Sequence, residues 1–372
     1  MVKQKMEITG GGIVYRNPKP HVRSRHAYFP WVVYTSNNEL IASFVLAQAF
    51  ESVDSNTYIS RSTDKGMTWS EPVAIIPSSA LVLRSNCARI TDMGNGHLVT
   101  MMVLSDRSGH PEEGLANPEN MGFVPTDLLV IHSFDNGNTW NKTDKVEAPL
   151  IGPSFEACSP ILVLRDGTWL WPTSTWRGWD GYCPNGMKMV ALVSYDQGKT
   201  WKDYLTVMDN TSQQIIHWEG KITELNNGNM LATAWVFDEK NGMDLPNHYA
   251  VSYDKGKNWT PPLSMNIVGQ TMATVQLDDG RIVVVYRRMD VAGLWLSVLS
   301  LSDATLNTED SACLWNGVQV PNNKRENMVT EFNELKFGAP CITKLSEKTL
   351  FITFWCYEKM VSNIRWVKVE LS

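Results

Sequence analysis

The chain has 372 residues, of which 43% are hydrophobic and 19% are charged, a balance that excludes a disordered protein. The formal net charge of −6 argues against nucleic acid or an anionic membrane surface as the main partner. No apolar run reaches the length of about eighteen residues that predicts a membrane span.

The N-terminal stretch MVKQKMEITGGGIVYR contains no apolar run long enough for the core of a signal peptide. A cytoplasmic location is therefore expected, although a secreted chain whose signal had been removed would look the same. The six cysteines are scattered and form no C-x-x-C pair, so we expect free thiols rather than disulfides.

An eight-residue motif, Ser-x-Asp-x-Gly-x-(Thr/Asn)-Trp, occurs at residues 62–69, 133–140, 194–201 and 252–259. Each copy follows an alternating stretch, such as TYISRS or LLVIHS, that predicts a β-strand. The motif therefore predicts a hairpin turn, in which the aspartate accepts backbone hydrogen bonds and the glycine adopts a positive φ. We interpret its four aspartates as structural; they are Asp64, Asp135, Asp196 and Asp254.

A second repeated signal is a polar turn between two apolar stretches. In chain order its copies are SNNELIASF, GNGHLVTMMV, RDGTWLWPT, NNGNMLATAW, LDDGRIVVVYRR and LSEKTLFITFW. Six such openings, about one per 50 to 70 residues, predict six four-stranded blades. MEITGGGIVYR is predicted to add a strand to the last blade and close the ring. The predicted fold is an all-β, six-bladed β-propeller that residues 1–372 form as a single domain.

The four motifs resemble the Asp-box, or BNR, repeats of the sialidase (neuraminidase) superfamily, and the resemblance covers nearly the whole chain. Stretches such as FEACSPILVLRDGTWLWPTSTWRGWDG, IHWEGKITEL and VYRRMDVAGLWLS are similar to a group of bacterial sialidase-like proteins. The resemblance implies a sialidase-like propeller. Sialidases bind the carboxylate of sialic acid with three arginines, and they use a tyrosine nucleophile, an assisting glutamate and an aspartate acid/base.

Some of these family residues have counterparts here. The assisting glutamate corresponds to Glu219, and the acid/base aspartate falls on or near Asp54. The third arginine corresponds to Arg287 or Arg288, one of which is expected to point inward.

Other family residues are replaced. The first-blade Phe-Arg-Ile-Pro motif corresponds to AYFP, so Tyr28 stands in place of the first arginine. The second arginine is missing near Trp235, and Ala339 stands where the nucleophilic tyrosine is expected. A two-carboxylate mechanism therefore fits better than the usual tyrosyl intermediate.

Polar residues gather where the innermost strand of each blade is predicted to begin, and in the loops beside those starts, such as the loop with Glu51 and Asp54. Tryptophan faces stack on sugar rings, arginines bind carboxylates or hydroxyls, and paired acids cleave glycosidic bonds. The candidate catalytic residues are Glu219, Glu156 and Asp54. The candidate substrate-binding residues are Arg25, Tyr28, Arg84, Arg89, Trp176, Arg177, Trp179, His217, Asp238, His248, Gln270, Arg287 and Arg288.

These residues predict an exo-acting glycoside hydrolase that uses a carboxylate pair on a non-sialic sugar, which can be acidic. One alternative is an exo-sialidase, or a hydrolase of another nonulosonic acid, with Arg25, Arg89 and Arg287 as an altered carboxylate clamp. Another is a non-catalytic carbohydrate-binding propeller. No spacing predicts a metal site or a phosphate loop, so no metal or cofactor is expected. The expected partner is a carbohydrate, with neither nucleic acid nor membrane, and the oligomeric state stays open.

Overall fold

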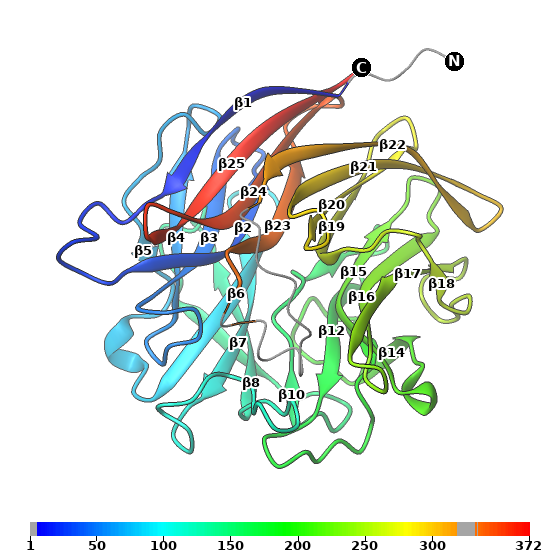
Figure 1. The fold of residues 1–372 in the computed structure, drawn as a ribbon, viewed down its shortest axis with the longest axis horizontal. Helices are drawn as coiled ribbons and strands as arrows, with labels where there is room; N and C mark the ends of the chain where they lie inside the picture. Colours follow the sequence, from blue (N-terminus) through cyan, green and yellow to red (C-terminus); the bar gives the residue numbers. More distant parts are fainter. Residues whose placement is uncertain (1–5, 318–331, 333) are drawn as a thin grey trace.

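The computed structural model describes residues 6–317, 332 and 334–372. Six sheets, the blades, stand around a central axis, as seen in the view down the shortest dimension (Figure 1). The predicted six-bladed β-propeller is therefore confirmed. Within the described residues, no helix is long and apolar enough to cross a membrane.

The first three blades follow one another along the chain. The first contains β2 (His26–Tyr34), β3 (Leu40–Ala47), β4 (Asn56–Ser62) and β5 (Val73–Ala74). The second contains β6 (Arg84–Asp92), β7 (Leu98–Asp106), β8 (Thr126–Ser133) and β9 (Lys142–Val146). The third contains β10 (Ser154–Phe155), β11 (Leu162–Val163), β12 (Trp169–Trp176), β13 (Met189–Ser194) and β14 (Asp203–Met208).

The other three blades complete the ring. The fourth contains β15 (Ile215–Glu224), β16 (Met230–Asp238), β17 (Met243–Ser252) and β18 (Leu263–Ser264). The fifth contains β19 (Gln270–Gln276), β20 (Ile282–Arg288), β21 (Gly293–Ser302) and β22 (Thr305–Asn316). The sixth contains β23 (Phe337–Lys344), β24 (Thr349–Glu358) and β25 (Val361–Leu371), and it is completed by β1 (Met6–Tyr15). The 3-10 turns η1 (Ser78–Ala80) and η2 (Thr211–Gln213) precede the second and fourth blades.

The N-terminal strand closes the ring, as predicted. β1 pairs antiparallel with β25, from Met6 opposite Leu371 to Tyr15 opposite Ile364. The last blade thus takes its fourth strand from the other end of the chain, and the two end strands lie side by side in Figure 1. This pairing covers an edge that an open sheet would expose.

The repeated motif forms the turn between the third and fourth strands of the first four blades. In the first copy, the Asp64 carboxylate accepts hydrogen bonds from the Thr68 N–H at 2.9 Å and from the Ser62 hydroxyl at 2.8 Å. Gly66 has a φ of 94°, as predicted, and Lys65 before it has a φ of 59°. A Cβ on Gly66 would also lie 2.7 Å from the Phe351 ring, so glycine serves both the turn and the packing.

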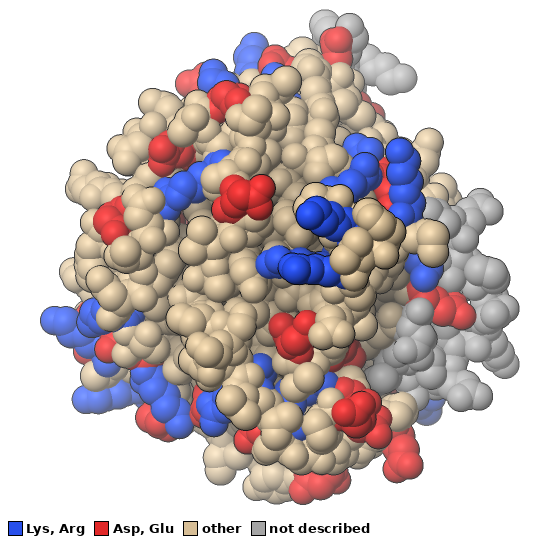
Figure 2. Space-filling view, turned by 90° about the vertical axis from the view of Figure 1, so that its left-hand side faces the viewer, with Lys and Arg blue, Asp and Glu red and all other residues tan. Residues whose placement is uncertain are grey.

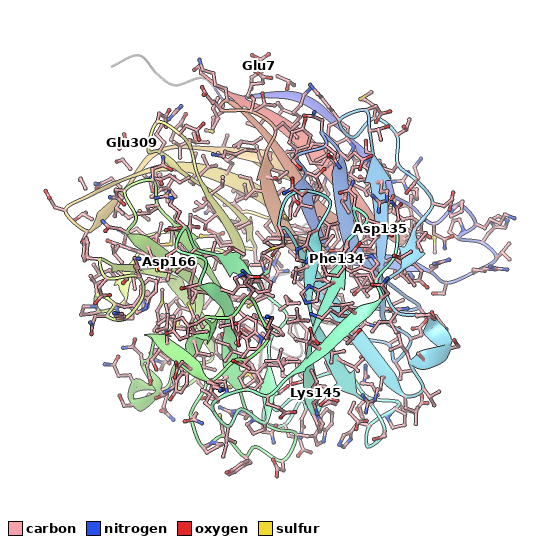
Figure 3. All side chains as sticks on the ribbon, turned by 180° about the vertical axis from the view of Figure 1, so that it is seen from behind. Glu7, Phe134, Asp135, Lys145, Asp166 and Glu309 are labelled. Atoms are coloured by element: carbon pink, nitrogen blue, oxygen red, sulfur yellow. The ribbon has the colours of Figure 1, made fainter. Side chains whose placement is uncertain are left out.

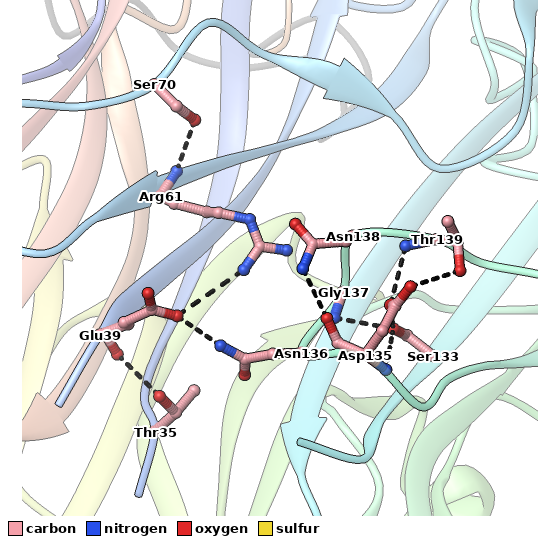
Figure 4. A network of polar contacts seen from close by, with 10 residues as sticks. All are labelled: Thr35, Glu39, Arg61, Ser70, Ser133, Asp135, Asn136, Gly137, Asn138 and Thr139. Carbon is pink, nitrogen blue, oxygen red and sulfur yellow. Dashed lines mark hydrogen bonds and ion pairs between the residues drawn. The ribbon is translucent and has the colours of Figure 1, made fainter. Parts of the chain in front are cut away.

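The second copy of the motif is also tied to the neighbouring blade (Figure 4). Asn136 donates a hydrogen bond to the Glu39 carboxylate, which lies 3.8 Å from the Arg61 guanidinium. Glu39 belongs to the turn after β2, so the motif and this first turn lie at one end of the propeller. The starts of the innermost strands lie at the other end.

Among the described residues, six apolar clusters lie one between each pair of adjacent blades, and a seventh, which includes Trp176 and Trp218, lies between the third and fourth blades. Between the first and second blades, for example, buried Ile41 and Ile59 pack with Ile90 and Met102. The side chains seen in Figure 3 fill these spaces between the sheets. The burial of two faces per sheet explains why the second strands read as nearly continuous apolar runs. All six cysteines are free thiols, as expected from their scatter.

Candidate active site

Four innermost strands contain a β-bulge close to their start. The register shifts after Tyr28, Trp218, Gln270 and Gly338. The next residue in each strand has a positive φ; these residues are Phe29 (52°), Glu219 (48°), Thr271 (47°) and Ala339 (44°). Positive φ is uncommon for residues other than glycine, and bulges of this kind re-aim side chains. All four residues line one cavity.

This cavity, which we call the axial cavity, lies where the innermost strands begin and has a volume of about 180 Å³. Each blade contributes a residue near the start of its innermost strand: Phe29, Cys87, Ala157, Glu219, Thr271 and Ala339. The aromatic lining consists of Phe29, Phe50, Phe123, Phe155, Trp218, Trp235, Phe332 and Trp355. The charged lining consists of Glu51, Arg89, Glu156, Glu219 and Arg287. Carboxyl groups, guanidinium groups and ring faces therefore line one cavity, which is partly open to solvent.

Glu156 reaches the cavity because the innermost strand of the third blade is interrupted. β10 ends at Phe155 and β11 begins at Leu162, so the residues between them leave the ladder. Pro160 lies in this gap and has no N–H to donate to a neighbouring strand. The backbone is held instead by the Thr173 hydroxyl, which donates to the Glu156 carbonyl at 3.0 Å.

Glu156 and Glu219 form a coupled pair. The Glu219 N–H donates to Oε2 of Glu156 at 3.0 Å. Burial, together with the nearby Glu219 carboxylate, raises the pKa of Glu156 to about 8, so Glu156 is protonated at neutral pH. Burial also raises the pKa of Glu219, but the positive charges of Lys221, Arg287 and Arg89 oppose this rise. The negative charge of the pair is therefore favoured on Glu219.

Arg287 is held against the cavity by a chain of hydrogen bonds. Its Nε donates to the Gln270 side chain at 2.8 Å, and Gln270 donates to Asp244 at 2.7 Å. The indole N–H of Trp235 donates to the other carboxylate oxygen of Asp244, also at 2.7 Å. The guanidinium carbon lies 5.7 Å from the centre of the Trp235 ring. Asp244 thus orients two groups that line the cavity.

Glycine lets Arg287 approach the sixth blade closely. A Cβ on Gly338 would lie 2.3 Å from Nη1 of Arg287, a distance that real structures exclude. The same Nη1 donates to the Phe337 carbonyl at 3.2 Å. The Gly338–Ala339 step of the sixth blade therefore makes room for the arginine of the fifth.

Glu51 is a third carboxyl group in the cavity, supplied by the loop between β3 and β4. Burial raises its pKa to about 7, against the opposing effects of the Leu115 N–H and of Arg107. The Leu115 N–H donates to Oε2 at 3.1 Å, and Arg107, which is fully buried, donates to the Glu51 carbonyl at 3.0 Å. The only sequence signal for Glu51 was its position in a loop beside the predicted site.

Asp54 and Arg25 lie outside the axial cavity and line a separate groove. Asp54 is exposed, and its carboxylate accepts a hydrogen bond from the Gln48 N–H at 3.1 Å. Of the three candidate catalytic residues, the structure therefore brings together Glu156 and Glu219 but not Asp54.

Tyr28 is fully buried beside the cavity and does not line it. Its hydroxyl lies 2.7 Å from the Tyr357 hydroxyl. Burial and this hydrogen bond raise the pKa of Tyr28 far above the ordinary value for tyrosine. None of the described residues that line the cavity is a tyrosine.

Trp176 and His217 are buried and do not line the axial cavity. Trp176 is 2% exposed and stacks on Trp218 with a centroid distance of 5.0 Å, and Trp218 lies 4.2 Å from Trp235. The ring of His217, fully buried, lies 3.0 Å from Nδ1 of His248, and burial lowers the pKa of His217 to about 3.

The remaining candidates have partners elsewhere. Trp179 stacks on His110, Arg177 pairs with Glu239, Arg84 with Asp127 and Arg288 with Asp290, while Asp238 accepts from Asn241. None of these five candidates lines the axial cavity, and their role in substrate binding stays a prediction. Of the two neighbouring arginines, Arg287 is the one that points inward.

A metal centre finds no support in the described part of the chain. There, no three histidine, cysteine, aspartate or glutamate side chains are grouped so that they could hold a metal ion. The chemistry available in the cavity is that of carboxyl, guanidinium and aromatic groups.

The sequence matches a known family of repeat proteins. A family model described as a BNR repeat-like domain matches residues 114–353. A search of curated proteins found no match.

Solved structures share the fold over nearly the whole chain. A protein of unknown function from Dyadobacter fermentans DSM 18053 is 18% identical, with 99% of each chain covered and a TM-score of 0.74. The Hadza microbial sialidase Hz136 is 17% identical, covering 97% of this chain and 68% of its own, with a TM-score of 0.66. The intramolecular trans-sialidase from Ruminococcus gnavus is 12% identical, covering 93% and 94%, with a TM-score of 0.61. At these identities the likeness shows the fold alone.

Proposed function

The chain belongs to the BNR repeat-like domain family, and from this premise we propose that it is an exo-acting glycoside hydrolase that works from the axial cavity. The propeller is similar to those of sialidases, which supports glycoside hydrolysis or carbohydrate binding. Fold alone does not define an activity, so the proposal rests on the residues of the cavity. The observation that supports the proposal most directly is the lining of the axial cavity. Three carboxyl groups line it together with Arg89, Arg287 and eight aromatic side chains; the carboxyl groups are those of Glu51, Glu156 and Glu219.

The size of the cavity favours action at the end of a glycan. Its volume of about 180 Å³ lies below the range of roughly 300 to 1,000 Å³ that is typical for drug-sized ligands. A single sugar ring fits such a space better than several rings do. The aromatic lining supplies apolar faces on which a ring can stack.

Glu219 is the proposed base or nucleophile. Its carboxylate lies among the positive charges of Lys221, Arg287 and Arg89, which favour the ionised form. Its backbone is held by the hydrogen bond to Glu156 and has a strained φ of 48°. Glu156, which is protonated at neutral pH, then positions Glu219 without adding a second negative charge.

Glu51 is the proposed general acid. Acid and base must flank the bond that is cleaved, and the first and fourth blades stand opposite each other in a ring of six. Glu51 comes from the first blade and Glu219 from the fourth, whereas Glu156 contacts the backbone of Glu219 itself. A pKa of about 7 leaves Glu51 partly protonated at neutral pH, which suits proton transfer to a leaving oxygen.

The charged lining favours an acidic sugar. Arg89 is 6% exposed and Arg287 3% exposed, and both face the cavity, where a guanidinium fork matches the geometry of a carboxylate. The absence of tyrosine from the described lining, together with the buried state of Tyr28, supports a carboxylate mechanism over a tyrosyl intermediate.

The proposal is tested by screening aryl glycosides of neutral and acidic sugars, with NMR used to follow the anomeric form of the first product. We expect one or more acidic glycosides to be cleaved from the non-reducing end, with a single stereochemical outcome. If no glycoside is cleaved while a sugar still binds in the cavity, the chain is a carbohydrate-binding propeller and the proposal fails.

A further inference from the structure

A second hollow, which we call the outer groove, lies on the first blade. It has a volume of about 540 Å³ and is lined by Arg23, Ser24, Arg25, Leu46, Ala47, Gln48, Asp54, Tyr58, Ser78 and Leu81. The segment between β1 and β2, which carries Arg23 and Arg25, projects at the left of Figure 1, next to β5. That side faces the viewer in Figure 2, where positively and negatively charged side chains both stand near the centre.

One loop separates the outer groove from the axial cavity. It joins β3, which ends at Ala47, to β4, which begins at Asn56. Phe50, Glu51 and Ser55 of this loop line the axial cavity, whereas Gln48 and Asp54 line the outer groove. The two sites therefore share a wall. A glycan chain that leaves the axial cavity across this loop enters the outer groove.

The groove presents two guanidinium groups. Neither Arg23 nor Arg25 forms an ion pair with any described residue, unlike Arg84 or Arg288. The Arg25 guanidinium carbon lies 5.1 Å from the centre of the Tyr58 ring, so the guanidinium is held over one face of this ring.

The groove is also held in shape by its own hydrogen bonds. The Ser24 hydroxyl donates to the Gln48 carbonyl at 2.8 Å, which ties the arginine segment to the shared loop. The one acid in the groove, Asp54, is tied to its own loop through Oδ1, which accepts from the Gln48 N–H at 3.1 Å and from the Ser52 hydroxyl at 2.5 Å. Two guanidinium groups and one carboxylate therefore share the groove, so positive charge prevails there.

We propose that the outer groove binds an acidic sugar unit on the leaving-group side of the substrate, while the axial cavity holds the terminal sugar. Its occupant is a hexuronate residue, whose carboxylate pairs with Arg23 and Arg25. This inference rests on the proposed function for the direction of the chain, and it extends that function from one sugar to an acidic oligosaccharide.

The test measures binding rather than turnover. In a Glu219→Gln background, calorimetry compares a panel of hexuronate-containing tetrasaccharides with their carboxyl-reduced, neutral counterparts. The test variant adds Arg23→Ala and Arg25→Ala. The control adds Lys199→Ala and Lys202→Ala instead, which removes the same charge from exposed residues outside the groove.

We expect at least one acidic tetrasaccharide to bind, and its affinity to fall at least tenfold in the arginine variant but less than twofold in the lysine control. Its carboxyl-reduced counterpart is expected to bind weakly to all three proteins. Equal binding of acidic tetrasaccharides to the arginine variant, or no preference for them over the neutral forms, overturns the inference. Turnover by wild-type protein is scored separately, so a failed hydrolase proposal and a failed groove proposal give different results.

Discussion

The N–H of Glu219 donates to the carboxyl group of Glu156 at 3.0 Å, across two adjacent blades. Glu219 lies in a bulge of β15 and has a positive φ of 48°, so its N–H is outside the regular ladder with β16. The two acids therefore act as a unit, and the charge of one depends on the other.

The stability of the protein is expected to depend on the charge of Glu156. Its pKa in the folded state, about 8, lies above the ordinary value of 4.5, so the folded state holds the proton more tightly. The resulting contribution to stability is complete below about pH 4.5 and is lost as the pH rises through about 8. Glu156→Gln removes this dependence.

Thermal unfolding from pH 5 to pH 9 measures the effect. The midpoint of Glu156→Gln is expected to rise relative to wild type as the pH increases, with the difference largest at pH 9. Parallel curves for the two proteins would contradict the raised pKa.

Glu51→Gln is expected to slow hydrolysis most for substrates whose leaving group must be protonated as the glycosidic bond breaks. For substrates with poor leaving groups the loss is roughly 10² to 10⁴-fold, the usual contribution of general acid catalysis. Dinitrophenyl glycosides, whose leaving group needs no proton, are expected to lose little.

The pH profile gives an independent check on Glu51. With a pKa of about 7, its acidic form disappears as the pH rises, so the wild-type rate is expected to fall above pH 7. If Glu51→Gln slows good and poor leaving groups equally, Glu51 is not the acid.

Asp244→Asn tests the hydrogen-bond chain behind Arg287. An amide has one acceptor oxygen, so either Trp235 or Gln270 loses its partner. We expect weaker binding of acidic sugars, seen as a raised KM with a smaller change in kcat, and a shifted indole N–H resonance of Trp235. The control is Asp279→Asn; Asp279 pairs with Arg281 in the turn between β19 and β20, at the end of the fifth blade that is far from Arg287. Equal effects of the two variants would contradict a positioning role for Asp244.

The repeated motif is expected to serve stability and not the site. Asp196 accepts hydrogen bonds from the Thr200 N–H, the Thr200 hydroxyl and the Ser194 hydroxyl, each at 2.8 Å. Asp196→Ala should lower the free energy of unfolding by on the order of 1 kcal/mol or more, while Asp203→Ala, at an exposed position, should stay within about 0.5 kcal/mol. Chemical denaturation measures both. If folded Asp196→Ala protein no longer binds sugar, the purely structural role of the motif is contradicted.

The fold can be predicted from the sequence because the turn motifs that define it are local and repeated. Each Asp64-type turn marks the junction of the third and fourth strands of a blade, and each polar first turn marks the junction of the first and second strands. The starts of the innermost strands are predictable for the same reason, which is why the sequence indicates Glu156, Glu219 and Arg89 as site residues.

The orientation of side chains in loops cannot be predicted in the same way, because side chains in a loop do not alternate regularly between two faces as they do in a strand. Glu51 and Asp54 are three residues apart, yet one faces the axial cavity and the other the outer groove. Trp176 was predicted to contact ligand, but its ring is buried, and its N–H donates to the Met121 carbonyl at 2.6 Å. Arg287 and Arg288 alternate across a strand, so only the structure tells which of them points inward.

The most direct test of the central claim is the rate at which Glu219→Gln and Glu156→Gln cleave the best glycoside found for the wild-type protein, with Asp203→Asn as the matched control. We predict that Glu219→Gln loses at least about a hundredfold in kcat, that Glu156→Gln is also impaired, and that the control keeps the wild-type rate. All three must show the wild-type circular dichroism spectrum. Full activity in folded Glu219→Gln and Glu156→Gln would contradict catalysis by the carboxylates of the axial cavity.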